Sequence, residues 1–414
     1  MSSGLLERVR AVLPGIRWES ASPALVGASE ATSAAGARIA RRLAIELDGP
    51  RRTVVVLNDE SRGTSPEAVA VLVRAAVSAS RSVKVIFARG SHPLPAKPAY
   101  EGHRDLAFAR LGPEDLDGLP VLHHVAREKE SQGELAGFLL NKEVLEADKV
   151  LALGSVEPHY FAGWTGAHKT ATVGVMGFRS IETNHELALD PGSHVLALEG
   201  NPVFEGIARA ADALGERLVC VNEVRVGDRL VAWGAGRWRP ALESVLDAAR
   251  TVYVRKIAAP VDLLVAATEG PLGRNLYQAE KGVKNSEICV RDGGAVVLLA
   301  PCEDGTGPAR FLELLARAKD HATALAILKA EGYRLGDHKA VKVRALEARG
   351  VRWHIASSGL VGNPAAARAV SEAGLALHGT LEDALAAARS ELGTELGRAL
   401  LVEDAGNIVV HVGA

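Results

Sequence analysis

The segment TVVVLNDESRGTSPEAVAVLVRAAVSA, residues 53–79, decides the fold class. It opens with a continuous apolar and β-branched run, Thr53 to Leu57, which is typical of a strand covered on both faces. A polar loop follows, and Pro66 then stands where the first residue of a helix running to Ala79 is expected. A buried strand, a loop and a helix in this order predict a βαβ unit and a mostly parallel sheet.

The same order of elements recurs along the chain, each apolar run being followed by a loop rich in Gly, Ser, Asp or His. Further strands are expected at residues 82–87, 149–153, 261–267, 295–300 and 351–357. The fold class that we expect is therefore α/β, with two α/β domains built on mostly parallel sheets.

The boundary between these domains is expected near residue 258, because Pro260 precedes a new strand. We expect residues 1–258 to form the first domain and residues 259–394 to form the second. The C-terminal tail, about 395–414, contains an apolar run at residues 408–412, which we expect to return to the first domain as a last strand.

Composition excludes several classes of protein. Of the 414 residues, 48% are hydrophobic and 24% are charged, which is the balance of a globular protein and not of a disordered one. The net charge of −2 predicts neither a nucleic-acid partner nor a membrane surface, and no apolar run reaches the ~18 residues that a membrane helix needs. The N-terminus lacks the features of a secretory signal, so a cytoplasmic protein is expected. Three widely spaced cysteines indicate buried thiols.

Reactive side chains follow several of the predicted strands, at the end where open parallel sheets bind ligands. Each also has a structural explanation: Asp59 fits a turn cap, and a single loop histidine is more often structural than catalytic. Their repetition at strand ends favours a common site, whereas His123 and His124 lack this context. The candidates are Asp59, Ser61, Arg62, His92, His159, Lys169 and His185.

Three familiar motifs are absent on inspection. Residues 163–170 approach a P-loop, but His168 stands where the loop needs glycine for its amides to hold a phosphate. Residues 234–239 begin like a dinucleotide fingerprint and lack its third glycine. The histidines do not have the HExxH spacing of a zinc peptidase.

Six short motifs together make a specific pattern between about residues 50 and 310. In chain order they are DESR at 59–62, GSH at 90–92, PHYFAGWTGAHK at 158–169, TNH at 183–185, GNP at 200–202 and NLYQAEKG at 275–282. In this order and spacing, the chain resembles the nickel-dependent lactate racemase family, known as LarA.

The resemblance implies a two-domain enzyme with its site in the cleft between the domains. It implies racemisation or epimerisation of a 2-hydroxy acid by reversible hydride transfer through a 2-keto acid. The cofactor implied is a nickel-pincer nucleotide, a pyridinium thioamide/thiocarboxylate mononucleotide, covalently bound to Lys169 with nickel held by His185. The partners implied are the small 2-hydroxy acid and the enzymes that make the cofactor, while the oligomeric state stays open.

The resemblance also implies roles for single residues. His92 and His159 match the acid/base pair, because the hydroxyl group lies on opposite sides in the two enantiomers and histidine titrates near neutral pH. The first domain is then the catalytic and cofactor-binding one, and the second contributes substrate-binding residues. The remaining matches are Asp59 and Arg62 in catalysis, Ser61 and Gly166 at the cofactor, and Tyr277, Gln278 and Lys281, with Arg62, at the substrate.

Departures from the family pattern leave the substrate open. Arg274, His168 and Trp164 suit a longer or more polar acid, such as malate or a sugar acid. Two other classes compete with the main interpretation: another metal-dependent lyase or hydrolase that uses the histidines, and a small-acid binding protein without catalysis. Binding alone needs no acid/base pair, which argues against the second of these.

Overall fold

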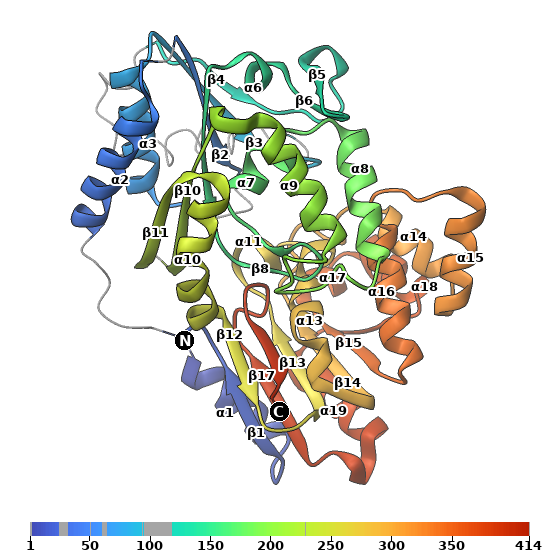
Figure 1. Cartoon of the computed structure of the whole chain (residues 1–414). Coiled ribbons are helices and arrows are strands. Elements are labelled where there is room, and N and C mark those ends of the chain that lie inside the picture. Colours follow the sequence, from blue (N-terminus) through green and yellow to red (C-terminus); the bar gives the residue numbers. More distant parts are fainter. Residues whose placement is uncertain are drawn as a thin grey trace. The chain divides into compact units, whose positions relative to one another are not determined.

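The computed structural model describes residues 2–24, 32–49, 51–59, 64–92, 94, 118–227 and 229–413. The chain divides into two compact units. The N-terminal unit comprises Ala24–Glu157 and Phe161–Val252, and the C-terminal unit comprises Met1–Pro23, Pro158–Tyr160 and Tyr253–Ala414. Each unit contains one six-stranded, mostly parallel sheet with helices beside it, so the predicted α/β fold class is confirmed (Figure 1).

The sheet of the N-terminal unit has the strand order β11-β10-β7-β2-β3-β4, in which only β11 is antiparallel to its neighbour. The strands predicted at residues 53–57, 82–87 and 149–153 lie in this sheet as β2, β3 and β7. In chain order its strands are β2 (Arg52–Asn58), β3 (Ser82–Ala88), β4 (Val121–His123), β7 (Lys149–Ser155), β10 (Leu218–Val226) and β11 (Arg229–Arg237).

Helices cover both faces of this sheet. On one face, α2 (Thr32–Glu46) and α3 (Pro66–Ala79) lie side by side over an apolar core (Figure 1). Helix α3 begins at the predicted proline, and the Ser65 hydroxyl caps it by accepting a hydrogen bond from the Ala68 amide at 3.0 Å. The other face carries α7 (Ala167–Thr170), α9 (Pro202–Leu214) and α10 (Trp238–Tyr253). The remaining elements of the unit are η1 (Lys129–Ser131), β5 (Gln132–Leu135), β6 (Phe138–Asn141), α6 (Lys142–Glu146), β9 (Gly163–Trp164), η2 (Val173–Val175), α8 (Phe178–Glu186), η3 (Leu187–Leu189) and η4 (Gly215–Arg217).

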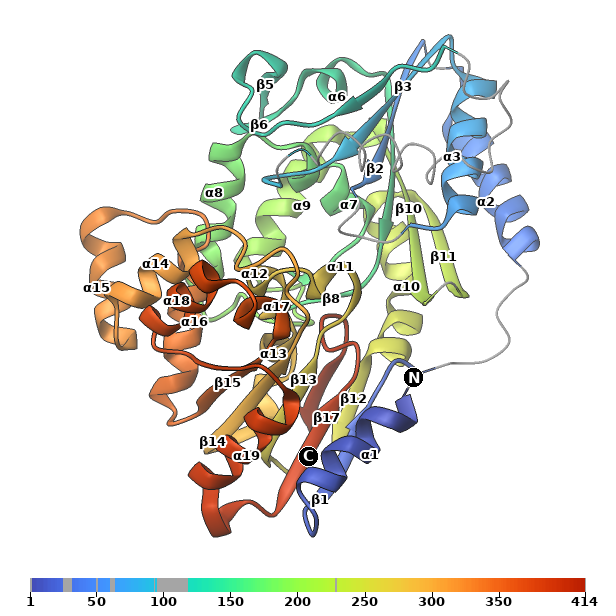
Figure 2. The ribbon, with the colours of Figure 1, turned by 180° about the vertical axis from the view of Figure 1, so that it is seen from behind.

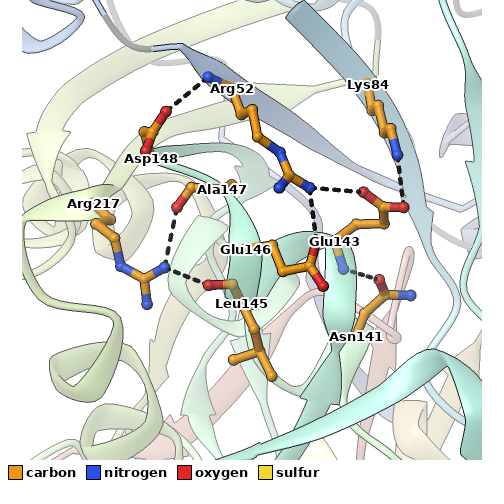
Figure 3. Close-up of polar contacts among 9 residues, drawn as sticks. All are labelled: Arg52, Lys84, Asn141, Glu143, Leu145, Glu146, Ala147, Asp148 and Arg217. Carbon is orange, nitrogen blue, oxygen red and sulfur yellow. Dashed lines mark hydrogen bonds and ion pairs between the residues drawn. The ribbon is translucent and has the colours of Figure 1, made fainter.

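The amino ends of the strands are closed by a polar cluster (Figure 3). Arg52, at the start of β2, forms ion pairs with Glu146 at 2.8 Å and Glu143 at 3.8 Å, and Lys84 of β3 reaches Glu143 at 2.7 Å. Arg217 donates hydrogen bonds to two carbonyl groups at the end of α6. These contacts attach α6 to the amino edge of the sheet and lie at the opposite end of the strands from the candidate site residues.

The sheet of the C-terminal unit has the order β1-β17-β13-β14-β15-β16 and is parallel throughout. Helices α1 and α19 pack together on one face over an apolar core, and α13 packs against β13 and β14 (Figure 2). The strands are β1 (Arg17–Ala21), β13 (Val261–Ala267), β14 (Val290–Leu299), β15 (Arg352–Ala356), β16 (Ala376–His378) and β17 (Arg398–Val402), with β12 (Val254–Ile257), β18 (Val409–Val412) and the short β8 (Pro158–His159) outside the sheet. The helices are α1 (Ser2–Val12), α11 (Gly270–Gly273), α12 (Leu276–Ala279), α13 (Lys281–Ser286), η5 (Glu287–Cys289), α14 (Arg310–Arg317), α15 (His321–Glu331), α16 (Asp337–Ala348), α17 (Ser358–Val361), α18 (Pro364–Glu372), α19 (Leu381–Leu392) and η6 (Gly393–Glu395).

The division of the chain differs from the predicted domains, 1–258 with 395–414 and 259–394. The prediction that the tail joins the first domain is wrong, because β17 lies between β1 and β13 and β18 pairs with β12, all in the C-terminal unit. The first 23 residues belong to that unit too, and so do Pro158–Tyr160. An apolar run shows that a strand is buried, but the sheet that it joins depends on long-range pairing that its own residues do not reveal.

Two smaller expectations concern the whole chain. The three cysteines are free and buried, as predicted. Among the helices that the structure describes, none combines the length and the apolar character needed to cross a membrane.

Candidate active site

A carboxylate and a histidine meet at the carboxyl end of the N-terminal sheet. Asp59 directly follows β2 and is 3% exposed, and His92 follows β3 after a turn at Gly90, which has a positive φ of 54°. The His92 Nδ1 lies 2.7 Å from the Asp59 Oδ2. A carboxylate at Nδ1 favours the tautomer with its proton on that nitrogen, so Nε2 becomes the basic nitrogen of the ring. The two candidates from neighbouring strands therefore form one dyad.

Lys169 lies on α7, a short helix held against the end of the sheet by residues from three strands. The Ala167 amide donates to the Asn222 side-chain oxygen at 2.8 Å, and the Thr170 hydroxyl donates to Asn58 at 2.8 Å. A Cβ on Gly154 of β7 would lie 2.3 Å from the Ala167 nitrogen, so glycine allows the helix to touch the strand. These contacts fix the backbone that carries the half-buried Lys169.

Gly166, predicted to contact the cofactor, is the residue before α7. Its φ of 152° suits glycine, and a Cβ there would lie 2.9 Å from the Asn222 side-chain oxygen and 3.0 Å from His168 Nδ1. Glycine is thus required for the tight entry into the helix that carries Lys169.

His185 lies in the last turn of α8 and is half-buried, with its ring edge-on to Phe161 at 5.2 Å. Asn201, from the GNP motif, supports this region. Its side-chain amide donates to the carbonyl group of Phe161 at 2.9 Å, and its oxygen caps α9 by accepting from Phe204 at 3.1 Å. The GNP motif at residues 200–202 is part of the family pattern, but the sequence alone gave Asn201 no role. The structure shows that it anchors the segment beside His185.

The other candidates belong to the C-terminal unit. His159 is 5% exposed on β8, and its ring stacks on Tyr160 at 5.5 Å with 12° between the ring planes. Tyr277 and Gln278 lie on α12 and Lys281 begins α13, and all three are half-buried. Glu280, between the two helices, has helical dihedral angles (φ −53°, ψ −27°), so the predicted i, i+3 spacing of Gln278 and Lys281 is retained.

Three residues considered for a longer substrate have other contacts. The Arg274 guanidinium forms a bidentate pair with Asp304 at 2.7 and 2.9 Å. Trp164 is fully buried and donates to the Leu196 carbonyl at 3.2 Å. His168 is fully buried against Trp238, with ring centroids 5.4 Å apart, and burial, followed by the charges of Lys169 and Arg239, lowers its pKa to about 3. His168 and Trp164 are thus buried in the N-terminal unit, whereas Arg274 forms an exposed pair in the C-terminal unit.

Some expectations fall elsewhere. Ser61 and Arg62 lie outside the described residues. His124, expected to be structural, is buried and shares a hydrogen bond of 2.7 Å with the Met176 carbonyl. In the part of the chain that the structure describes, no group of three or more His, Cys, Asp or Glu side chains is placed to hold a metal ion.

Comparison with known families identifies the chain. The profile of the lactate racemase N-terminal domain matches residues 38–195, and that of the lactate racemase C-terminal domain matches residues 256–410. The chain belongs to the lactate racemase family. Family membership makes it an isomerase of the racemase type.

Individual members of the lactate racemase family are distant relatives. The lactate racemase of Thermoanaerobacterium thermosaccharolyticum is 26% identical over 297 residues, which span 68% of this chain and 67% of that protein. The lactate racemase of Lactiplantibacillus plantarum is 24% identical over 289 residues, 66% of this chain and 65% of that protein. The matched stretches thus span about two thirds of each relative.

Solved structures support the fold. The lactate racemase apoprotein from T. thermosaccharolyticum superposes with a TM-score of 0.79 at 22% identity, covering 97% of this chain and 95% of that one. A protein from Thermotoga maritima superposes with a TM-score of 0.70 at 16% identity, covering 94% of this chain and all of that one (100%).

The residues around α7 fit a polar cofactor of the kind used in the lactate racemase family. The side-chain nitrogens of Asn58 and Asn222 are buried without a hydrogen-bond partner among the described residues, although both side chains hold α7 through their oxygens. Buried donors of this kind are usually satisfied, so a bound polar group would complete them. A primary amine at Lys169 and an imidazole at His185 are suitable for covalent attachment and for nickel, respectively.

Sequence reasoning missed one further group at this end of the sheet. Glu223, near the end of β10, is fully buried, and one of its carboxylate oxygens accepts from the Ser65 amide at 3.0 Å. Burial raises the pKa of Glu223 to about 7. The available signal was a charged residue inside the apolar run Leu218–Val224.

Proposed function

We propose that this chain interconverts the enantiomers of a small 2-hydroxy acid of the lactate type. The observation that carries the proposal is the Asp59–His92 dyad, because a histidine held at one nitrogen by a buried carboxylate is oriented for proton transfer at the other. Membership of the lactate racemase family supplies the reaction class. The names of the two curated relatives supply lactate as the first substrate to test.

Hydride transfer is the proposed route for the hydrogen on C2. Removing that hydrogen as a proton would place a carbanion beside a carboxylate, which is costly. If it leaves as a hydride while the hydroxyl proton moves to a histidine, a planar 2-keto acid results, and hydride return to its other face inverts the centre. A nickel-pincer nucleotide, attached to Lys169 and held at its nickel by His185, supplies the hydride acceptor and donor when it is bound.

Side chains of this protein transfer the hydroxyl proton, stabilise negative charge and orient the substrate. His92 and His159 accept and return the hydroxyl proton, one for each enantiomer, and Asp59 keeps His92 in its tautomer. Lys281 and Arg62 bring positive charge to the substrate carboxylate and the developing alkoxide. Gln278 and Tyr277 orient the acid, while Ser61 and Gly166 belong to the cofactor side. Enzymes that make the cofactor are the expected partners.

A lactate-sized acid is favoured over a longer one. The expectation of malate or a sugar acid rests on Arg274, His168 and Trp164, of which the first is paired with Asp304 and the other two are fully buried. A panel of lactate, malate and sugar acids, each assayed on a chiral column, checks this. Preferential turnover of malate would overturn the preference for a small substrate.

The decisive experiment is co-expression with the cofactor-making enzymes, followed by intact mass and metal analysis. We expect a mononucleotide-sized adduct on Lys169, nickel in equal amount to the chain, and neither in Lys169→Arg. Racemisation of 2-deuterio-L-lactate in ordinary water should retain deuterium in D-lactate, since a hydride returns to the carbon that it left. Metal without an adduct would indicate an ordinary metal-dependent lyase or hydrolase, and deuterium loss to solvent would exclude hydride return.

A further inference from the structure

The C-terminal unit contains a buried ion pair that the proposed mechanism does not use. The Lys339 Nζ lies 2.7 Å from the Glu280 Oε2, and the two side chains are only 2% and 1% exposed. Glu280 lies between α12 and α13, and Lys339 lies in the first turn of α16, 59 residues further along the chain. A buried pair is weak evidence for stability, because removing two charges from water offsets much of their attraction. Its position therefore needs another explanation.

The ammonium group of Lys339 also lies near two tyrosine rings. The Nζ is 5.1 Å from the centre of the Tyr160 ring and 4.5 Å from that of Tyr277, both within the range of cation–π attraction. Tyr160 follows His159 in the chain and stacks on its ring at 5.5 Å. The buried Lys339 ammonium thus contacts a tyrosine from each of two separate segments of the chain, Tyr160 beside His159 and Tyr277 on α12.

Each contact of this pair adjoins a proposed active residue. Tyr160 adjoins His159, Tyr277 precedes Gln278, and Glu280 precedes Lys281. Burial lowers the pKa of Lys339, and the charge of Glu280 and its hydrogen bond oppose that change. The unpartnered Oε1 of Glu280 is buried as well, which leaves Lys339 as the one counter-ion drawn to that carboxylate among the ion pairs of the described residues.

Helix α16 holds Lys339 in a fixed place. The Asp337 carboxylate, fully buried, accepts from Arg310 at 2.7 and 3.2 Å and from the Arg334 amide at 2.9 Å. His338 Nδ1 is 2.6 Å from the Tyr333 hydroxyl, and its ring lies 6.4 Å from Tyr160. Because the start of α16 is bound on several sides, Lys339 has little freedom to follow a moving tyrosine.

We propose that Lys339 and Glu280 are positioning residues for the reaction, holding His159 through Tyr160 and the segment 277–281 through Tyr277 and Glu280. This inference rests on the proposed function, since His159, Gln278 and Lys281 act on the substrate only if that proposal is right. Neither Lys339 nor Glu280 touches substrate in this scheme. Their effect is on the placement of the acid/base histidine and of the residues that bind the acid.

The test compares Lys339→Met with a matched control, Lys284→Met. Lys284 is also a buried lysine and forms an ion pair with Glu287 at 2.6 Å. Its ammonium group lies 5.7 Å from the centre of the Trp353 ring, a different aromatic residue from the two that face Lys339. A double variant, Lys339→Met with Glu280→Met, removes both charges together and so avoids an unpaired buried carboxylate. All are made in the full chain loaded with cofactor.

Two readouts separate positioning from stability. The first is the ring Cε1–H NMR signal of His159, assigned with His159→Gln, which reports its stacking on Tyr160 whether or not the protein racemises lactate. The second readout is the racemisation rate. Displacement of His159 in the variants should lower kcat, and displacement of Gln278 and Lys281 should raise KM. A small displacement of reacting groups lowers the rate by about 10–100-fold, and we expect kcat/KM to fall within that range.

We expect Lys339→Met and the double variant to shift the His159 signal and to lower kcat/KM. The double variant should keep a Tm near that of the parent. Lys284→Met should change neither the His159 signal nor kcat/KM. An unchanged His159 signal and unchanged kinetics would overturn the inference. So would losses in the double variant that simply follow a lower Tm, or equal effects in Lys284→Met. If the parent racemises nothing, the proposed function fails, and the His159 signal alone still decides the positioning claim.

Discussion

The substitution Asp59→Asn tests the dyad on which the proposed function depends. The Asp59 carboxylate is almost fully buried and accepts a hydrogen bond of 2.7 Å from His92 Nδ1. In the proposed mechanism His92 becomes an imidazolium when it takes the hydroxyl proton, and the carboxylate then stabilises a charge that the amide of asparagine cannot. The change keeps the size of the side chain, so the loss falls on the chemical step.

The size of the loss follows from the exposure of the two partners. A hydrogen bond to a charged group contributes about 1.5–3 kcal/mol, which corresponds to roughly 10- to 150-fold in rate. The Asp59 side chain is 4% exposed but that of His92 is 37% exposed, so solvent screens one end of the pair. We therefore expect kcat to fall by about 10- to 30-fold, with a smaller change in KM. If the asparagine NH2 turns toward Nδ1, the wrong tautomer forms and the loss rises toward about 10⁴-fold.

The assay is lactate racemisation on a chiral column, with intact mass confirming that the variant carries the same adduct on Lys169. Asp148→Asn is the matched control, because Asp148 accepts a hydrogen bond from the Arg52 amide at the amino edge of the same sheet (Figure 3). A kcat within about threefold of the parent, where tens-fold is expected from losing a charge-assisted bond, would refute the role of the dyad. A loss fully explained by a missing adduct would refute it too.

Three further substitutions have expected outcomes. Glu223→Gln should raise the free energy of unfolding more at high pH than at low pH. Burial raises the pKa of Glu223 to about 7, so the native state of the parent loses about 3 kcal/mol of stability as the pH rises from about 4.5 to 7. Equal effects of the substitution in denaturant titrations at about pH 5 and 8 would contradict this. His168→Phe should unfold at lower pH than the parent and should still racemise lactate. Because the pKa of His168 is lowered in the native state, the parent loses about 3 kcal/mol of stability as the pH falls from about 6.5 to 4. A steeper acid unfolding transition in the variant would contradict a buried, neutral His168 ring. Arg274→Gln should leave the substrate panel unchanged and destabilise by at most about 1 kcal/mol, as its pair with Asp304 is exposed, whereas selective loss of malate turnover would restore the longer substrate.

Local patterns predicted the elements that depend on neighbouring residues. The β-branched run at 53–57 and Pro66 were sufficient for β2 and the start of α3, because burial on both faces and the first turn of a helix leave marks within a few residues. The run at 261–267 likewise matches β13. Strand ends followed by polar loops also located Asp59 and His92, although the bond between them was not foreseen.

Long-range pairing was beyond the reach of these patterns. Strand β1 has the polar sequence RWESA and lies at an edge of its sheet beside β17. The register pairs Ala21 with Val402, which comes 381 residues later in the chain. The pair between Arg274 and Asp304 joins residues 30 positions apart, so it could not be expected from the residues that flank Arg274. Lys339 shows nothing unusual in its sequence context, since its burial against Glu280 appears only when α16 packs beside α12 and α13.

The two histidines that we propose as the acid/base pair have different supports and belong to different units. His92 is held at Nδ1 by a buried carboxylate in the N-terminal unit, whereas His159 is buried against Tyr160 within the C-terminal unit. The chain achieves this by passing only Pro158–Tyr160 to the C-terminal unit between two long stretches of the N-terminal one. In the proposed mechanism each enantiomer uses one histidine to release the proton and the other to regain it, so we expect the overall rate to depend on both supports. If the inference about Lys339 and Glu280 is right, this pair and Asp59 have equivalent roles: Asp59 holds the His92 ring directly, and the pair holds the His159 ring through Tyr160.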